Sequence, residues 1–286
     1  MFIDIHTHAF HKKIARKAIA QIKAAYATDC TGDGTIEHLL AREQAAGIHR
    51  FVVLCAATAP AQVIPANNYA ISLQKKYPEV IAFGSMHPGY KNFEDELARL
   101  RQAGICGLKM HPDFQGFSMD DKSLLPIFEY AQKKFIIQFH IGSNKNPRDA
   151  PSSPEKLAAI LDNFPDLAVI AGHLGGYLMW EDAVRLFGGR RLKNLWFDTS
   201  SVSFFAHGDT VRELLRIWPE ERLLFGSDWP LFDIKEEQER LLRVGKLTRR
   251  KLEKIMSNAG GLFAAFARNS AGTAHDENLD AKDGMT

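Results

Sequence analysis

Met1-Phe2-Ile3-Asp4-Ile5-His6-Thr7-His8 begins the chain, and the interpretation of the rest depends on this stretch. Residues 2–5 have the character of a short β-strand, which leads directly into two histidines separated by one residue. Side chains two residues apart in a strand point to the same face, so His6 and His8 would project side by side. Two neutral imidazoles held in this way form half of a metal site. The alternative is a pair of ordinary surface histidines, and the downstream sequence argues against it.

The composition is that of an ordinary globular protein. Of 286 residues, 45% are hydrophobic and 24% are charged, and the formal net charge is +2. Such a chain can bury a sizeable core, and its charge gives no support to nucleic-acid binding. Neither a bilayer-length apolar run nor a signal pattern is present, so no membrane partner is expected. Three scattered cysteines are too few for a disulfide framework, which favours a cytoplasmic protein.

Apolar runs typical of buried strands recur along the chain. They occupy residues 2–5, 51–55, 80–84, 105–110, 135–140, 167–173, 195–198 and 222–228. Segments of helical character separate the later runs, and two more helices follow, near residues 234–244 and 248–268. Strands of this kind alternating with helices predict a parallel sheet, and eight repeats predict an α/β fold, the (β/α)8 TIM barrel. A doubly wound open sheet is the structural alternative.

A barrel of this size needs no second domain, so we expect one domain over residues 1–268. The polar tail, residues 269–286, is expected to be disordered or loosely attached. Residues 12–46 form a helical insert after the first strand. Because its amphipathic helices must bury an apolar face, we expect it to cover part of the barrel mouth or to form an inter-subunit contact, as in a homodimer.

Titratable side chains stand where five of the predicted strands end. In chain order they are His6 and His8, Lys109 and His111, His140, His173, and Asp228. The carboxyl ends of barrel strands are where active sites lie. A titratable group after an apolar run is costly to bury without a partner, so these positions predict a site.

Metal catalysis is the chemistry that this set favours. Catalytic zinc takes three or four nitrogen or oxygen ligands and leaves a position for water. His6, His8, His140 and Asp228 would supply these ligands at one barrel mouth. The metal would activate water and polarise a substrate oxygen. His173 is then left over as a general acid or base.

These motifs resemble the amidohydrolase superfamily of metal-dependent barrel enzymes. The resemblance runs from Asp4 to about Phe266 and rests on the first histidine pair and on Gly107-Leu108-Lys109-Met110-His111-Pro112, Phe139-His140-Ile141-Gly142, Gly172-His173-Leu174-Gly175-Gly176 and Gly226-Ser227-Asp228-Trp229-Pro230. The most similar branch contains aminocarboxymuconate-semialdehyde decarboxylase. It implies one divalent metal, usually zinc with manganese as the alternative, held by His6, His8, His140 and Asp228. It also implies catalytic roles for Asp228 and His173.

The resemblance leaves two roles open for Lys109. In binuclear members a lysine at this place is carboxylated and bridges two metals, whereas a free ammonium would bind a substrate carboxylate, which is the role we favour. His111 and Arg148 are further candidates for substrate binding, Arg148 as a clamp for an anion. Asp198 is either a partner for a ligand histidine or a turn cap.

Hydrolysis is the expected function: activated water would attack a C–O, C–N or C–C bond next to a carbonyl in a small, carboxylate-bearing substrate. A non-oxidative decarboxylase using the same metal site is the alternative. A non-catalytic binding barrel is the second alternative, which the intact set of strand-end residues disfavours.

Overall fold

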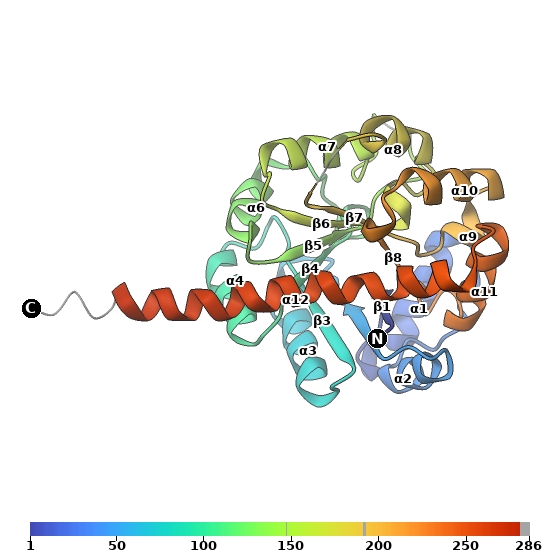
Figure 1. Ribbon diagram of the computed structural model, residues 1–286. Helices are drawn as coiled ribbons and strands as arrows, with labels where there is room; N and C mark the ends of the chain where they lie inside the picture. The colour runs from blue at the N-terminus through green and yellow to red at the C-terminus, as the bar shows by residue number, and fades with distance from the viewer. Residues whose placement is uncertain (147, 191–192, 281–286) are drawn as a thin grey trace, which may run out of the picture.

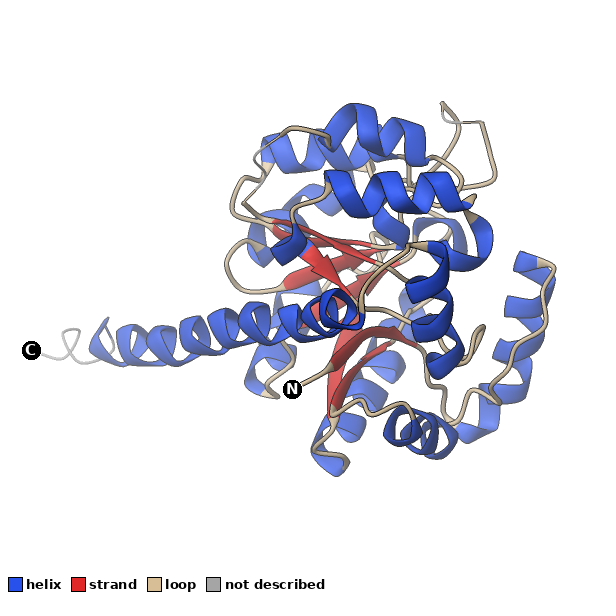
Figure 2. Cartoon of the chain, turned by 45° about the vertical axis from the view of Figure 1, so that its right-hand side comes forward, coloured by secondary structure: helices blue, strands red, loops and turns tan. Residues whose placement is uncertain are grey.

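Eight parallel strands, in the order β1 to β8, form the centre of the computed structural model, with helices around them (Figure 2). The structure describes residues 1–146, 148–190 and 193–280, with side chains up to Phe266 in the last helix. The strands are β1 Ile3–Thr7, β2 Arg50–Leu54, β3 Val80–Ser85, β4 Gly107–Met110, β5 Ile136–Phe139, β6 Ala168–Ala171, β7 Leu195–Asp198 and β8 Leu223–Leu224.

The sheet closes on itself. The Ile5 N–H donates to the Phe225 carbonyl oxygen at 2.9 Å, and the Asp228 N–H donates to the His6 carbonyl oxygen at 2.8 Å. The segment after β8 therefore runs beside β1, which excludes the open-sheet alternative and confirms the TIM barrel. Regular pairing in β8 is shorter than residues 222–228, the range expected from the sequence.

The α-helices surround the barrel (Figure 1). They are α1 Lys12–Tyr26, α2 Ile36–Ala45, α3 Val63–Lys76, α4 Phe93–Gln102, α5 Pro112–Gln115, α6 Leu125–Ala131, α7 Pro154–Asn163, α8 Trp180–Phe187, α9 Val202–Phe205, α10 Gly208–Ile217, α11 Ile234–Val244 and α12 Arg249–Asp280. The helical segment before β5 is divided into a 3₁₀ turn, Lys122–Leu124, and α6. Pro126 explains the break, because proline has no N–H to continue a helix but fits its first turn.

An apolar cluster fills the N-terminal end of the barrel. It combines early strand residues such as Ile3 and Phe83 with Leu262 of α12, which packs against β1 and β8. The Phe83 ring is fully buried, and a Cβ on Gly107 would overlap it. Glycine is therefore needed at this position of β4 so that the Phe83 ring can occupy the barrel interior.

The helical insert lies over the opposite end, as expected. The Gly32 N–H, between α1 and α2, donates to the Pro230 carbonyl oxygen at 3.0 Å. A side chain at Gly32 would overlap the Trp229 indole, so glycine lets this loop approach the segment after β8. Ile22 and Tyr26 of α1 line the cavity at the barrel mouth.

The last helix is longer than the sequence predicts. It continues to Asp280 rather than ending near Arg268, and its final part extends away from the barrel (Figure 1). The helix thus includes residues 269–280 of the expected tail, while residues 281–286 lie outside the described residues. Among the described helices, none has the length and apolar character needed to cross a membrane.

Replacing Phe83 by alanine should destabilise the protein by ~3–5 kcal/mol, because a fully buried ring would leave a cavity. Urea unfolding followed by circular dichroism measures this cost. The matched control is Phe114→Ala, whose ring is 39% exposed and should cost clearly less. Equal costs for the two variants would contradict the assignment of Phe83 to the core.

Candidate active site

A cavity of about 380 Å³ opens at the carboxyl ends of the strands. Its floor carries the predicted strand-end residues His6, His8, Lys109, His111, His140, His173 and Asp228. Its walls are largely apolar and include Phe10, Ile22, Phe114, Pro230 and Leu231. The predicted constellation is therefore brought together in one place.

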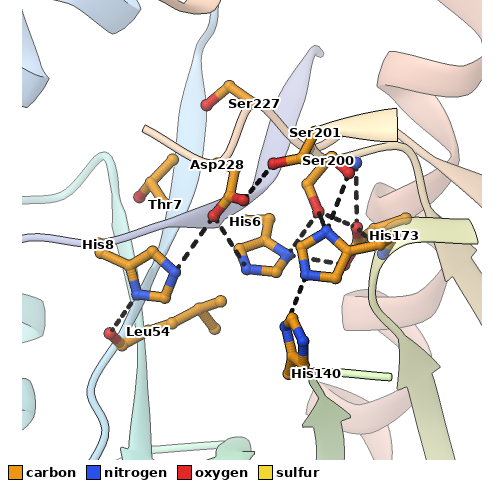
Figure 3. A network of polar contacts seen from close by, with 12 residues as sticks. His6, Thr7, His8, Leu54, His140, His173, Ser200, Ser201, Ser227 and Asp228 are labelled. Carbon is orange, nitrogen blue, oxygen red and sulfur yellow. Dashed lines mark hydrogen bonds and ion pairs between the residues drawn. The ribbon is translucent and has the colours of Figure 1, made fainter. Parts of the chain in front are cut away.

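His6, His8 and Asp228 converge on one point (Figure 3). Oδ1 of Asp228 lies 3.5 Å from Nε2 of His6 and also 3.5 Å from Nε2 of His8. Ligands about 2.1 Å from a tetrahedral zinc ion are about 3.4 Å apart. These two distances therefore fit two edges of such a site.

The other nitrogen of each of these histidines faces a hydrogen-bond acceptor. Nδ1 of His6 lies 2.9 Å from Oδ2 of Asp198, and Nδ1 of His8 lies 3.3 Å from the Leu54 carbonyl oxygen. Each Nδ1 therefore carries the proton, and each Nε2 keeps its lone pair. Burial, followed by the charge of Lys109, lowers the pKa of His6 to about 4. At neutral pH His6 is consequently in the uncharged form that binds metal.

A second chain of hydrogen bonds orients His140. Nδ1 of His173 lies 3.0 Å from the Ser200 carbonyl oxygen, so it donates, and the Nε2 of a neutral His173 is left as an acceptor. That Nε2 lies 2.8 Å from Nδ1 of His140, which must be the donor. The lone pair of His140 is consequently on its Nε2. All three predicted histidine ligands thus have the same tautomer.

Other groupings of these side chains could also hold a metal. Ligand atoms of His6, His173 and Asp228 lie within 4.8 Å of one another, as do those of His111, Asp113 and His140. Both nitrogens of His173 already have partners, however. Both oxygens of Asp113 accept hydrogen bonds, from Ser143 and Ser152. The set His6, His8, His140 and Asp228 stays a prediction, and two of its distances, from Oδ1 of Asp228 to Nε2 of His6 and of His8, suit a metal site.

Lys109 occupies the floor of the cavity in full burial. Its Nζ lies 3.2 Å from Nε2 of His6, and burial lowers its pKa to about 8. The carboxylates of Asp198 and Asp228 raise that pKa but do not offset burial. Lys109 thus lies beside His6, and its two predicted roles both stay predictions.

His111 and Tyr26, the last residue of α1, both line the cavity and contact each other. The His111 ring stacks on His140 with centroids 4.0 Å apart, and its Nε2 lies 3.3 Å from the Tyr26 hydroxyl. Nδ1 of His111 accepts the Phe114 N–H at 3.4 Å, so Nε2–H donates to the tyrosine oxygen. The phenolic O–H is then available to a bound molecule. Sequence reasoning missed Tyr26 because nothing local distinguishes it on an insert helix.

Arg148 is the predicted site residue that does not join the others. It is exposed on the loop after β5 and is not among the residues that line the cavity. Its backbone N–H donates to Oδ1 of Asn146. An anion-binding role for Arg148 stays a prediction.

Two serines after β7 belong to the site although the sequence analysis did not select them. The Ser200 hydroxyl donates to Oδ1 of Asp198 and lies 2.9 Å from Nδ1 of His6. The Ser201 hydroxyl donates to Oδ2 of Asp228. Asp198 was expected to be either a partner for a ligand histidine or a turn cap, and it pairs with His6. A polar run at a strand end, Asp198-Thr199-Ser200-Ser201, is the signal that could have indicated these residues.

Comparison with known proteins gives a family match. A family model described as amidohydrolase matches residues 3–259, which is most of the chain. None of the curated proteins matches this chain in sequence.

Several solved structures share the fold. An uncharacterized TIM-barrel protein from Bordetella bronchiseptica has a TM-score of 0.75 at 19% identity, covering 93% of this chain and 99% of that one. Dihydroxybenzoic acid decarboxylase from Polaromonas sp. JS666, with bound manganese and the inhibitor 2-nitroresorcinol, has a TM-score of 0.67 at 16% identity over 92% and 96% of the two chains. The 5-carboxyvanillate decarboxylase LigW from Sphingomonas paucimobilis has a TM-score of 0.65 at 16% identity over 92% and 99%.

The double variant His6→Ala/His8→Ala should lose its divalent metal and keep its fold, because both side chains lie at the barrel mouth. Elemental analysis would measure the metal, and circular dichroism the fold. The wild-type protein should hold about one metal per chain. The control is His207→Ala, which removes an exposed histidine outside the cavity.

Unchanged metal content in the double variant would overturn the ligand assignment. A stoichiometry near two in the wild type would instead favour a carboxylated Lys109 that bridges two ions.

Proposed function

Because the chain belongs to the amidohydrolase family, we propose that it is a metal-dependent enzyme that removes carbon dioxide, without oxidation, from a small carboxylic acid. The observation that carries this proposal is the fully buried Lys109 on the cavity floor, 3.2 Å from His6. A buried ammonium is costly unless it meets an anion, and a substrate carboxylate would supply one. The shared fold with decarboxylases of dihydroxybenzoate and carboxyvanillate gives further support.

His6, His8, His140 and Asp228 are the proposed metal ligands, with zinc or manganese as the ion. A divalent ion there would act as a Lewis acid on a substrate oxygen. Manganese is included because three of the structures with the same fold contain it. The apolar walls, among them Ile22 and Phe114, would hold the body of the acid and exclude water.

Decarboxylation breaks one carbon–carbon bond and leaves the electron pair on the substrate carbon. A proton must take the place of the carboxylate. His173 and Asp228 are the proposed proton carriers, because both line the cavity and both can hold an exchangeable proton. The hydrogen bonds of His173 to Ser200 and His140 would return it to one orientation after each proton transfer.

Hydrolysis is the second candidate. The description of the family model as amidohydrolase favours it, and the same ligands would serve to activate water. Water is consumed in hydrolysis and not in decarboxylation, so the two reactions are separable by their products.

The zinc- or manganese-loaded protein should release labelled carbon dioxide from 2,6-dihydroxybenzoate or 5-carboxyvanillate carrying carbon-13 in the carboxylate. In deuterated water the product should carry one deuterium at the vacated carbon. Mass spectrometry of gas and product measures both. If both acids stay intact and the metal-loaded protein instead cleaves members of a panel of esters and lactones, the protein is a hydrolase and this proposal is wrong.

His173→Ala should keep the metal and lose turnover by roughly 10²–10⁴-fold, because one acid–base group is removed. The loss should appear in kcat. His87→Ala is the control, since His87 lies 3.1 Å from the Gln115 carbonyl oxygen outside the cavity lining. Near-normal kcat would make His173 a structural residue, and loss of the metal would make it a ligand.

A further inference from the structure

Ser201 is held in a backbone conformation that serine rarely adopts. Its φ is 61°, in the left-handed region, and its side chain is 1% exposed. Glycine is the residue that this conformation favours. A serine at such a position indicates that the surroundings use its hydroxyl.

The Ser201 hydroxyl has one partner, Oδ2 of Asp228, among the described residues (Figure 3). The other oxygen of this carboxylate, Oδ1, lies 3.5 Å from Nε2 of both His6 and His8. The two oxygens of Asp228 therefore face different groups: one faces the proposed ligand histidines, and the other receives a proton donor.

We propose that Ser201 is a positioning residue that holds Asp228 so that only Oδ1 is offered to the metal. This inference rests on the proposed role of Asp228 as a metal ligand. A carboxylate without a partner for its second oxygen can turn about its χ2 bond or bind an ion through both oxygens. The hydroxyl bond removes that freedom.

The helix that follows Ser201, α9, is held by hydrogen bonds to α11. The Ser203 hydroxyl donates to Oε2 of the buried Glu237 at 2.7 Å, and Arg240 donates to the Ser203 carbonyl oxygen at 2.8 Å. These contacts join α9 to α11, outside the ligand set. They do not involve Asp228, so Ser203 offers a matched control for the loss of a buried hydroxyl.

Ser201→Gly and Ser201→Ala test the proposal with cobalt(II) as the probe. The glycine variant removes the hydroxyl and suits the left-handed backbone, whereas the alanine variant removes the hydroxyl and keeps the strain. Chelator competition measures cobalt affinity, and visible absorption reports its coordination geometry. Both variants should bind cobalt about 10–100-fold more weakly and should share an altered spectrum, because both lose the bond to Asp228.

The thermal unfolding midpoint of the metal-free Ser201→Gly variant should not fall, because glycine relieves the backbone. The control is Ser203→Ala, which removes a buried hydroxyl from α9, two residues further along the chain. It should lower the unfolding midpoint and leave the cobalt spectrum unchanged.

Wild-type affinity and spectrum in Ser201→Gly would overturn the proposal while leaving the metal site intact. An unchanged spectrum in Asp228→Asn would overturn it as well, because Asp228 would then not be a ligand. A wild-type protein that binds no cobalt would overturn both this inference and the proposed metal-dependent function.

Discussion

The carboxylate of Asp198 is the contact on which the geometry of the site depends. It is fully buried and accepts hydrogen bonds from Nδ1 of His6, from Gln138, from the His173 N–H, and from the N–H and hydroxyl of Ser200. These donors come from β1, β5 and the segments after β6 and β7. Burial alone would raise the pKa of Asp198, but His6 and the hydrogen bonds hold it below its usual range. A carboxylate that is ionised at neutral pH therefore joins four parts of the barrel mouth.

The two ends of the barrel differ in what they bury: apolar side chains at one end and polar groups at the other. At the N-terminal end, Phe83 and Leu262 exclude water and supply apolar burial. At the carboxyl end, polar groups are buried at a cost that only partners can offset. His6, His8 and His140, the three proposed ligand histidines, each donate from Nδ1 to an acceptor, which turns the lone pair of Nε2 toward a ligand. Apolar burial at the N-terminal end thus stabilises a barrel whose other end contains costly buried polar side chains.

Much of this could be predicted from the sequence, for reasons specific to the barrel. Parallel strands bring their carboxyl ends together, so a histidine or aspartate after an apolar run can be placed without knowing any long-range contact. That reasoning located His6, His140 and Asp228. It could not locate Tyr26, which reaches the cavity because Gly32 lets the insert dock on Trp229. Arg148 was chosen on other grounds; it is not among the residues that line the cavity, and its role stays a prediction. The length of α12 was missed because its last part, beyond Arg268, has no apolar periodicity to predict a helix.

Backbone strain gives the site a second signature, one that a sequence does not reveal. Among the described residues, His173, Leu174, Ser201 and Asp228 all have positive φ, although none is glycine. Each such conformation costs about 1–3 kcal/mol, so four together in one region need compensation. The hydrogen bonds of Asp198 to the His173 N–H and of Ser201 to Asp228 provide part of it. Unfavourable backbone conformations therefore occur where hydrogen bonds direct side chains toward one point. Their co-occurrence indicates that selection acted on the position of these side chains rather than on the stability of the protein.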